Sequence, residues 1–298
     1  MNVEQAYYKD NTMEEWAFNR HVDDKLINEL NKTTLWQEWL KNDCKSGEVF
    51  LALRKDCISF YHKGGSLFKF DSDGFSTHVK YASVIDTNNE DAEKNKIYEK
   101  QLGKKMPLIK NFISGYSQIK KNCELYSGKE AIGVSHLLKN STYLLKNESY
   151  IVLDIEIVLK DKKKDRIDIL LFDTTTKMLR FVEAKHFTND DIWAKGVPNV
   201  VKQIHNYENQ IDLHKKNIIA EYSRYIKNIN RIFNMQLPSP KEIDKKVSLL
   251  IFGFDDAQKK DDRFKTLILE KPEYQDIPIY SRGKQDGLKA ETIWKETK

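Results

Sequence analysis

The chain opens with a helical pattern of apolar positions. Thr12 and Glu15 have the spacing of a capping box, and apolar side chains recur behind them every three or four residues as far as Leu40. The sequence therefore predicts helix over residues 12–40, with a second short helix at its end.

The pattern then changes to that of β-structure. Two apolar runs, 49–62 and 66–72, are joined by Lys63-Gly64-Gly65, where two glycines supply the positive φ that a tight hairpin needs. Residues 76–84 extend this small β element. A lysine-rich helical stretch over 91–123 follows, interrupted near Gly103 and Pro107. We place the boundary of an N-terminal α+β region, residues 1–110, in this stretch.

The remainder, residues 111–298, has a different pattern of predicted helices and strands. Ser127 and Glu130 form a second capping box, which opens a helix. Pro198 suits the first turn of a longer helix, which Pro238 and Pro240 end. The predicted order is helix 127–139, strands 149–159, 166–172 and 178–185, helix 198–234 and strand 247–254, followed by a short helix and an apolar run over 277–280. This order predicts the α/β class, as an α+β mixed sheet flanked by helices.

Composition narrows the class of protein. With 298 residues, 40% of them hydrophobic, the chain has enough apolar material for a core, and 32% charged residues give it a well-solvated surface. The longest apolar run, 247–254, is far shorter than the roughly 20 residues that span a bilayer. The N-terminus has no secretory pattern, and three widely spaced cysteines fit a reducing compartment. We expect a cytoplasmic protein with no membrane partner. Its net charge of +5 permits a polyanionic partner without demanding one.

The candidate chemistry lies on the three consecutive strands. In the first, residues 151, 153, 155, 157 and 159 are apolar and share one parity, while Asp154 and Glu156 have the other. Asp168 is the polar residue of the second strand, and an in-register hairpin places it opposite Glu156. In the third strand, Glu183 and Lys185 are two residues apart and point the same way.

Two readings of this patch are open. Crowded carboxylates are costly without a cation, and hard oxygen ligands select Mg²⁺ or Mn²⁺. Alternatively, Glu156 and Glu183 meet Lys185 and Arg180 in an ion-paired solvent face.

The same residues resemble a known signature. Ile167-Asp168, followed fifteen residues later by Glu183 in Phe181-Val-Glu183-Ala-Lys185, is similar to the Asp and Glu-x-Lys motif of the PD-(D/E)XK nuclease superfamily. The family's leading proline is replaced by Ile167. Gln203 and Tyr207 in the following helix resemble the Gln-x-x-x-Tyr motif of its RecB-like branches, although an amphipathic helix that packs Tyr207 also explains them. The resemblance covers about 127–255.

This resemblance implies a restriction endonuclease-like αβββαβ core. It also implies Mg²⁺ (or Mn²⁺) held by Asp168, Glu183 and the Ala184 carbonyl, with Glu156 or Glu130 as a further acid, although a capping role explains Glu130 as well. Lys185 would orient water or stabilise developing charge, and Gln203 and Tyr207 would position water or phosphate. The implied activity is that of a metal-dependent nuclease, a DNA endonuclease of restriction, phage defence or DNA repair.

The remaining expectations concern partners. We expect DNA rather than RNA as substrate, recognition of substrate or partner by the N-terminal region, and a homodimer as one way to cut both strands. The alternative is a catalytically silent or conditionally activated nucleic-acid-binding protein with the same fold. Tyr280-Ser-Arg-Gly-Lys284 is a basic turn, which a surface loop explains and a phosphate contact would also use.

Overall fold

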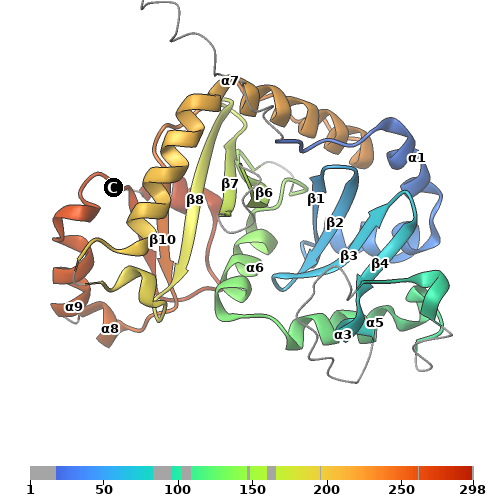
Figure 1. Cartoon of the computed structure of the whole chain (residues 1–298), viewed down its shortest axis with the longest axis horizontal. Helices are drawn as coiled ribbons and strands as arrows, with labels where there is room; N and C mark the ends of the chain where they lie inside the picture. Colours follow the sequence, from blue (N-terminus) through green and yellow to red (C-terminus); the bar gives the residue numbers. More distant parts are fainter. Residues whose placement is uncertain are drawn as a thin grey trace, which may run out of the picture.

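The computed structural model describes residues 18–82, 96–102, 109–145, 148–159, 166–194, 196–260 and 262–296. The predicted capping box at Thr12 and the interruptions at Gly103 and Pro107 lie outside these residues. The described part is a mixed α+β structure (Figure 1), built around two sheets. No helix in the described ranges combines the length and apolar character that a membrane span requires.

The N-terminal sheet is antiparallel, with the strand order β1-β2-β3-β4-β5. Its strands are β1 (Phe50–Arg54), β2 (Cys57–His62), β3 (Gly65–Asp71), β4 (Gly74–His78) and β5 (Lys96–Tyr98). The helical elements beside it are α1 (Asp24–Lys32), η2 (Trp36–Leu40), α2 (Lys41–Lys45), α3 (Val79–Ala82), η3 (Glu99–Gln101) and α5 (Phe112–Leu125).

Four details of this region differ from the sequence prediction. Residues 18–23 are not helical, and α1 begins only after Asp23, whose carboxylate accepts from the Leu26 N–H. The first β run is divided by a turn at Lys55-Asp56, with Asp56 at φ 58°. The next turn has positive φ at Lys63 and Gly64 rather than at Gly65. The predicted helix over 91–123 instead contains β5 and η3, and only α5 is a long helix.

The second sheet has the order β11-β10-β8-β7-β6. Strands β6, β7 and β8 are antiparallel neighbours, whereas β8, β10 and β11 are parallel. The elements are α6 (Lys129–Ser141), β6 (Tyr150–Ile157), β7 (Ile167–Asp173), β8 (Met178–His186), η4 (Asp190–Ile192), α7 (Asn199–Phe233), β9 (Glu242–Ile243), β10 (Ser248–Phe252), α8 (Asp256–Lys260), α9 (Asp262–Phe264), η5 (Lys265–Leu269), η6 (Pro272–Tyr274), β11 (Ile279–Arg282) and α10 (Ala290–Glu296). The predicted order of helix, three strands, helix and strand is therefore present.

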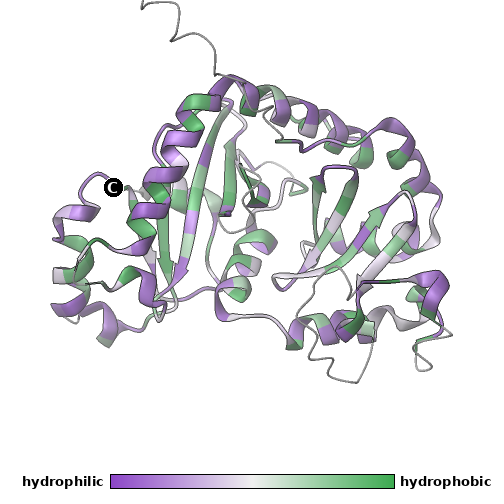
Figure 2. Cartoon of the chain, viewed as in Figure 1, coloured by the Kyte–Doolittle hydropathy of each residue, from purple (hydrophilic) through white to green (hydrophobic). Residues whose placement is uncertain are grey.

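Helices α6 and α7 cover opposite faces of this sheet. Phe252 of β10 packs on Gly133 of α6, where a Cβ would lie 2.1 Å from the ring. His186 of β8 pairs with Phe252 and shares that face. Because side chains alternate along a strand, Glu183 and Lys185 point to the other face, toward α7. Figure 2 shows the corresponding mixture of apolar and polar positions along α7.

Helix α7 also reaches the N-terminal half. Its 35 residues correspond to about 50 Å of helix, and Figure 1 shows it running from β10 to α1. The Phe233 ring near its end lies 5.6 Å from that of Trp36. The helix ends in a left-handed residue, Asn234 at φ 55°, four residues before the proline that was expected to stop it.

A bulge in β6 breaks the predicted alternation. Val152 pairs with Leu171 and Asp154 with Leu170, so Leu153 is an extra residue. The expectation that the apolar residues 151, 153, 155 and 157 share one face is therefore wrong, although all of them are buried.

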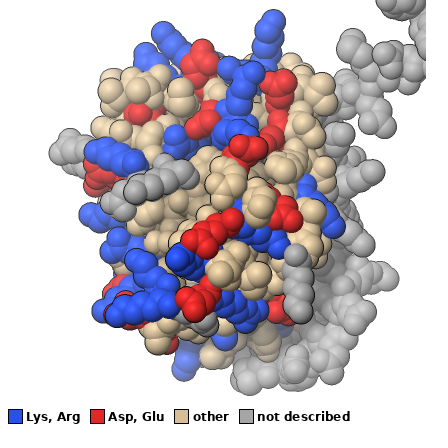
Figure 3. Space-filling view, turned by 90° about the vertical axis from the view of Figure 1, so that its left-hand side faces the viewer, with Lys and Arg blue, Asp and Glu red and all other residues tan. Residues whose placement is uncertain are grey.

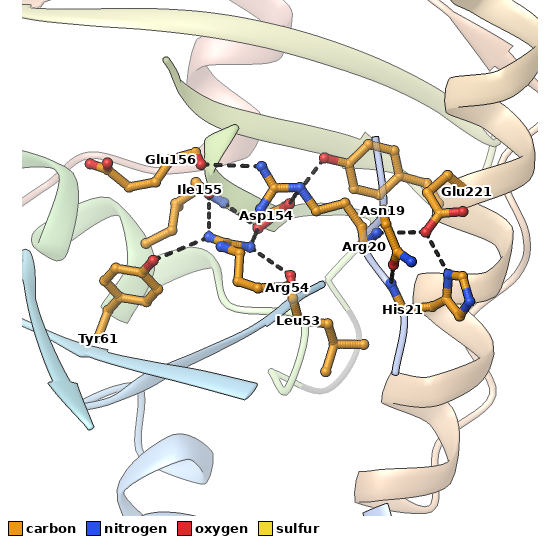
Figure 4. Close-up of polar contacts among 11 residues, drawn as sticks. Asn19, Arg20, His21, Leu53, Arg54, Tyr61, Asp154, Ile155, Glu156 and Glu221 are labelled. Atoms are coloured by element: carbon orange, nitrogen blue, oxygen red, sulfur yellow. Dashed lines mark hydrogen bonds and ion pairs between the residues drawn. The ribbon is translucent and has the colours of Figure 1, made fainter. Parts of the chain in front are cut away.

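Buried charges join the two sheets at this bulge (Figure 4). Arg54, at the end of β1, donates from Nη1 to Asp154 Oδ1 at 2.8 Å and from Nη2 to the Ile155 carbonyl at 2.6 Å. Arg20 lies on the other side, with Nε 3.7 Å from Asp154 Oδ2, and Tyr222 of α7 donates to the same oxygen. Asp154 is fully buried, so this cluster fixes β6 between the N-terminal sheet and α7.

Candidate active site

The strand register brings the two acids of the predicted motif together. Ile169 pairs with Val182 at the end of the ladder between β7 and β8, so the residues that follow in this register, Asp168 and Glu183, are neighbours. Asp168 Oδ2 accepts from the Ala184 N–H at 2.8 Å, which holds its carboxylate against β8. The register of the two strands therefore places both acids on the α7 face.

Lys185 completes the group. Its Nζ lies 2.7 Å from Glu183 Oε1, and both side chains are buried, with 10% and 1% of their surfaces exposed. The second carboxylate oxygen, Glu183 Oε2, is buried and has no hydrogen-bond partner in the described structure. A buried acceptor without a donor or cation is costly, so this oxygen is the clearest unsatisfied group of the site.

The electrostatics of the two carboxyls reflect their crowding. Burial, and then the charge of Glu183, raise the pKa of Asp168 above its ordinary value, against the opposing effect of Lys185. Burial raises the pKa of Glu183 to about 7, although Lys185 acts to lower it. For Lys185, burial opposes the charged form, but Glu183 and Asp168 outweigh it and raise the pKa of the ammonium. Lys185 therefore stays protonated. Its single positive charge lies next to two carboxyl groups, whose raised pKa values oppose the ionisation of both at once.

Glu130 adjoins this group but does not cap its helix. Gly128 is the N-cap residue of α6, and the Ser127 hydroxyl donates instead to the Cys123 carbonyl. The predicted capping box of Ser127 and Glu130 is therefore wrong. Glu130 Oε1 accepts from the His186 N–H at 3.2 Å and from Asn189 at 2.6 Å, and its charge acts on both Glu183 and Lys185.

Glu156 does not join the group. Ile155 pairs with Ile169 and Ile157 with Ile167, so the predicted position of Glu156 opposite Asp168 is confirmed. Its backbone has φ 52°, however, and its carboxylate binds Arg166 at 2.7 Å at the surface. Its charge makes only the last-named contribution to the raised pKa of Asp168, after burial and Glu183. Of the two additional acids that we considered, the structure brings Glu130 and not Glu156 to the motif.

The Gln203 and Tyr207 pair faces the sheet from α7. The Tyr207 hydroxyl donates to the Arg166 carbonyl at 2.9 Å, directly before β7 begins, so Tyr207 fixes the helix to the strand that carries Asp168. Gln203 lies one helical turn earlier, and its Oε1 is buried without a hydrogen-bond partner in the described structure. The site face therefore has two unsatisfied buried oxygens, one on β8 and one on α7.

Sequence reasoning missed Asp191, a residue of η4 between β8 and α7. Its charge raises the pKa of Glu183, and its carboxylate accepts from Asn199 at 3.1 Å. The only sequence signal was its position shortly after the Glu183 triplet. The histidines nearby have other roles, because His186 binds Thr188 and stacks edge-on with Phe252, and His205 is exposed.

The donor set suits Mg²⁺ or Mn²⁺ in part. Within the described ranges, no three His, Cys, Asp or Glu side chains form a group that would hold a metal ion by themselves. Mg²⁺, however, is commonly held by one or two carboxylates together with waters and substrate phosphates. Asp168 and the unsatisfied Glu183 Oε2 supply that smaller set of hard oxygen ligands.

Comparison with known proteins gave no match, either to protein-family models, to curated proteins or to solved structures. The resemblance to the nuclease superfamily thus depends on the residues and geometry described above.

Proposed function

We propose that this protein is a metal-dependent nuclease that hydrolyses phosphodiester bonds, with DNA as its substrate, on a restriction endonuclease-like core. The observation that carries the proposal is the unsatisfied, buried Glu183 Oε2, beside a buried Lys185 and opposite Asp168. In this arrangement two carboxylates lie next to an ammonium, and one buried carboxylate oxygen has no hydrogen-bond donor. Such a group is suited to bind a cation and a phosphate.

The acids and the lysine of the site would have separate roles. Asp168 and Glu183 would hold Mg²⁺ or Mn²⁺, with the Ala184 carbonyl as a further ligand. The ion, when bound, would supply a more acidic water and neutralise charge on the phosphate. Lys185 would place its ammonium beside the attacked phosphate and stabilise the developing negative charge. Its raised pKa keeps it charged at neutral pH, which favours this role over that of a general base.

Supporting groups position these side chains. The Ala184 N–H orients Asp168, and Tyr207 holds the start of β7. Gln203 would direct its buried amide to a water or a phosphate oxygen of the substrate. Glu130 would hold the carboxyl end of β8 in position, because it accepts hydrogen bonds from the His186 N–H and from Asn189.

The direct test is cleavage by the purified chain. Supercoiled plasmid, linear duplex and single-stranded DNA are incubated with Mg²⁺, with Mn²⁺ and with EDTA, and an RNA of matched length is included. We expect metal-dependent cutting of DNA, with nicked or linear plasmid as the mark of an endonuclease. Binding of DNA without cutting under every condition would instead favour the silent or conditionally activated alternative.

A further inference from the structure

An exposed aromatic patch lies where α5 ends. Leu125 is the last residue of this helix and Tyr126 is its C-cap, and 72% and 45% of their surfaces are exposed. Lys80 of α3 places its Nζ 4.7 Å from the centre of the Tyr126 ring and 5.6 Å from that of Tyr81. We call Lys80, Tyr81, Leu125 and Tyr126 the α5 patch.

Buried groups support this patch from below. Tyr81 is buried, and its carbonyl accepts from Asn122 at 2.8 Å, which joins α3 to α5 beside it (Figure 1). The Tyr81 ring lies 6.2 Å from that of Tyr126. A Cβ on Gly65 of the β2–β3 hairpin would lie 3.1 Å from the Tyr81 hydroxyl, so the hairpin packs closely on it. The exposed Tyr126 ring is therefore held in place before any partner binds, which lowers the entropic cost of binding.

The charges around the patch favour an anionic partner. Lys121 and Lys129 are exposed before and after Tyr126 in the chain, and Glu124 is the one acid between them. None of the lysines 80, 121 and 129 has an ion-pair partner among the described residues. On the side of the molecule that carries α8 and α9, by contrast, both signs of charge are interspersed (Figure 3). Three unpaired lysines beside one acid suit a phosphate backbone.

An exposed aromatic ring among lysines suits one form of nucleic acid in particular. Aromatic side chains stack on the bases of single strands, and lysines follow their backbone. In a duplex, neighbouring base pairs cover both faces of each base, so a protein reaches these faces only after unpairing. The Tyr126 ring can thus stack on an unpaired base but not on a base within a duplex.

The patch is close to the candidate active site along the chain. Tyr126 and Glu130 are four residues apart, so their Cα atoms are separated by at most about 14 Å. Glu130 accepts from the N–H of His186, the residue after Lys185, and its charge acts on both Glu183 and Lys185. Because Glu183 and Lys185 point toward α7, a strand with its cut phosphate at Lys185 would cross the carboxyl end of β8 to reach Tyr126.

We infer that the α5 patch binds an unpaired stretch of the substrate strand, with one base stacked on Tyr126 and neighbouring phosphates at Lys80 and Lys129. This inference rests on the proposed function and deepens it, because it names DNA with a single-stranded stretch as the substrate class. A negatively supercoiled plasmid also meets this requirement, because supercoiling favours strand separation.

The test measures binding without cleavage. Fluorescence anisotropy in EDTA compares labelled single-stranded DNA with a duplex of the same sequence, at several salt concentrations. We expect the single strand to bind more tightly, and Tyr126→Ala to weaken its binding at least about fivefold through loss of a stacked base. Tyr126→Phe keeps the ring and should stay within about twofold of the unmodified protein. Lys80→Ala should weaken binding and reduce the salt slope by about 0.7.

The control is a second tyrosine with a lysine over its ring. Tyr150, the first residue of β6, has the Lys295 Nζ 5.4 Å from its ring centre, outside the patch. Tyr150→Ala should bind the single strand as the unmodified protein does. Thermal melting shows that each variant is folded.

The outcomes separate this inference from the proposed function. Equal binding of single strand and duplex, or undiminished single-strand binding by Tyr126→Ala, would overturn the inference whether or not the protein cuts DNA. Equal losses in Tyr126→Phe and Tyr126→Ala would rule out stacking. Tighter, Tyr126-dependent binding of a matched RNA would overturn the choice of DNA. If nothing is cut in Mg²⁺ or Mn²⁺ but binding depends on Tyr126 as expected, the nuclease fails and the single-strand site stands.

Discussion

At the scale of single residues, Glu183 has two roles that oppose each other. Its burial and its neighbour Asp168 suit a cation, but they make the metal-free carboxylate costly. The pKa of about 7 expresses that cost, because the folded protein holds the Glu183 proton more tightly than the unfolded chain does. A group of this kind stabilises the protonated folded state fully below its unfolded pKa of about 4.5, and the effect is lost as the pH rises through about 7.

We therefore expect Glu183→Gln to be more stable than the unmodified protein in EDTA at pH 8. The gain should reach about 3 kcal/mol at most and vanish near pH 4.5, because glutamine is neutral and still accepts from Lys185. Urea denaturation of both proteins at a series of pH values measures the difference. Saturating Mg²⁺ should narrow it, and a variant that is less stable at pH 8 would show that the carboxylate is not strained.

At the scale of elements, the antiparallel strands were the most predictable part. The alternation of apolar positions gave β7 and β8 nearly to the residue, and with them the neighbouring positions of Asp168, Glu183 and Lys185. The bulge at Leu153 was not predictable, because its cause is tertiary: Arg54 binds both Asp154 and the Ile155 carbonyl from another sheet.

Glu130 shows the same limit. The local spacing of Ser127 and Glu130 favoured a capping box, but the carboxylate binds the His186 N–H and Asn189 fifty or more residues away. A local sequence pattern contains no information about such distant partners, because they come together only when α6 packs on β8. The position of Asp191 near Glu183 could not be predicted for the same reason.

The buried cluster at β6 gives a prediction for this element. Asp154→Ala should lower the free energy of unfolding by about 3–5 kcal/mol, because it leaves the Arg54 and Arg20 guanidiniums buried without their acid. Glu156→Gln, two residues along the same strand, removes only a surface ion pair and should cost less than about 1 kcal/mol. Equal effects of the two substitutions in urea denaturation would contradict the role given to Asp154.

At the scale of the whole molecule, several contacts join the N-terminal sheet to the second half, among them the hydrogen bond from the Tyr143 hydroxyl to the Leu51 carbonyl of β1. Two others carry predictions. One is the Asp154 cluster, and the other is the tip of the β2–β3 hairpin, which lies on α6. A Cβ on Gly64 would be 2.1 Å from the Ala131 Cβ, and one on Gly65 would be 2.5 Å from Cys123 Sγ. Helix α7 contacts both halves, through Phe233 on Trp36 and Tyr222 on Asp154. The N-terminal sheet therefore helps to hold β6 and α7, which flank the site, in place.

The hairpin contact predicts a difference between two glycines. Gly64→Ala combines a positive φ with a clash against Ala131, whereas Gly74→Ala has φ 100° but nothing within 4 Å. We expect Gly74→Ala to cost about 1–2 kcal/mol for the backbone alone, and Gly64→Ala to cost about 1–3 kcal/mol more. Thermal and urea denaturation of both variants measure the comparison. Similar losses would mean that the hairpin tip does not pack closely on α6.

The most direct test of the central claim compares plasmid cleavage rates of three proteins in Mg²⁺. These are the unmodified chain, Asp168→Asn and Glu156→Gln, each shown to be folded by its melting curve. Asparagine retains the acceptor for the Ala184 N–H but removes the charge, so we expect Asp168→Asn to lose cleavage by at least about a hundredfold. Glu156→Gln should cut at nearly the unmodified rate, because the Glu156 carboxylate binds Arg166 at the surface and its charge has only a minor effect on Asp168. Undiminished, metal-dependent cleavage by Asp168→Asn would contradict the account.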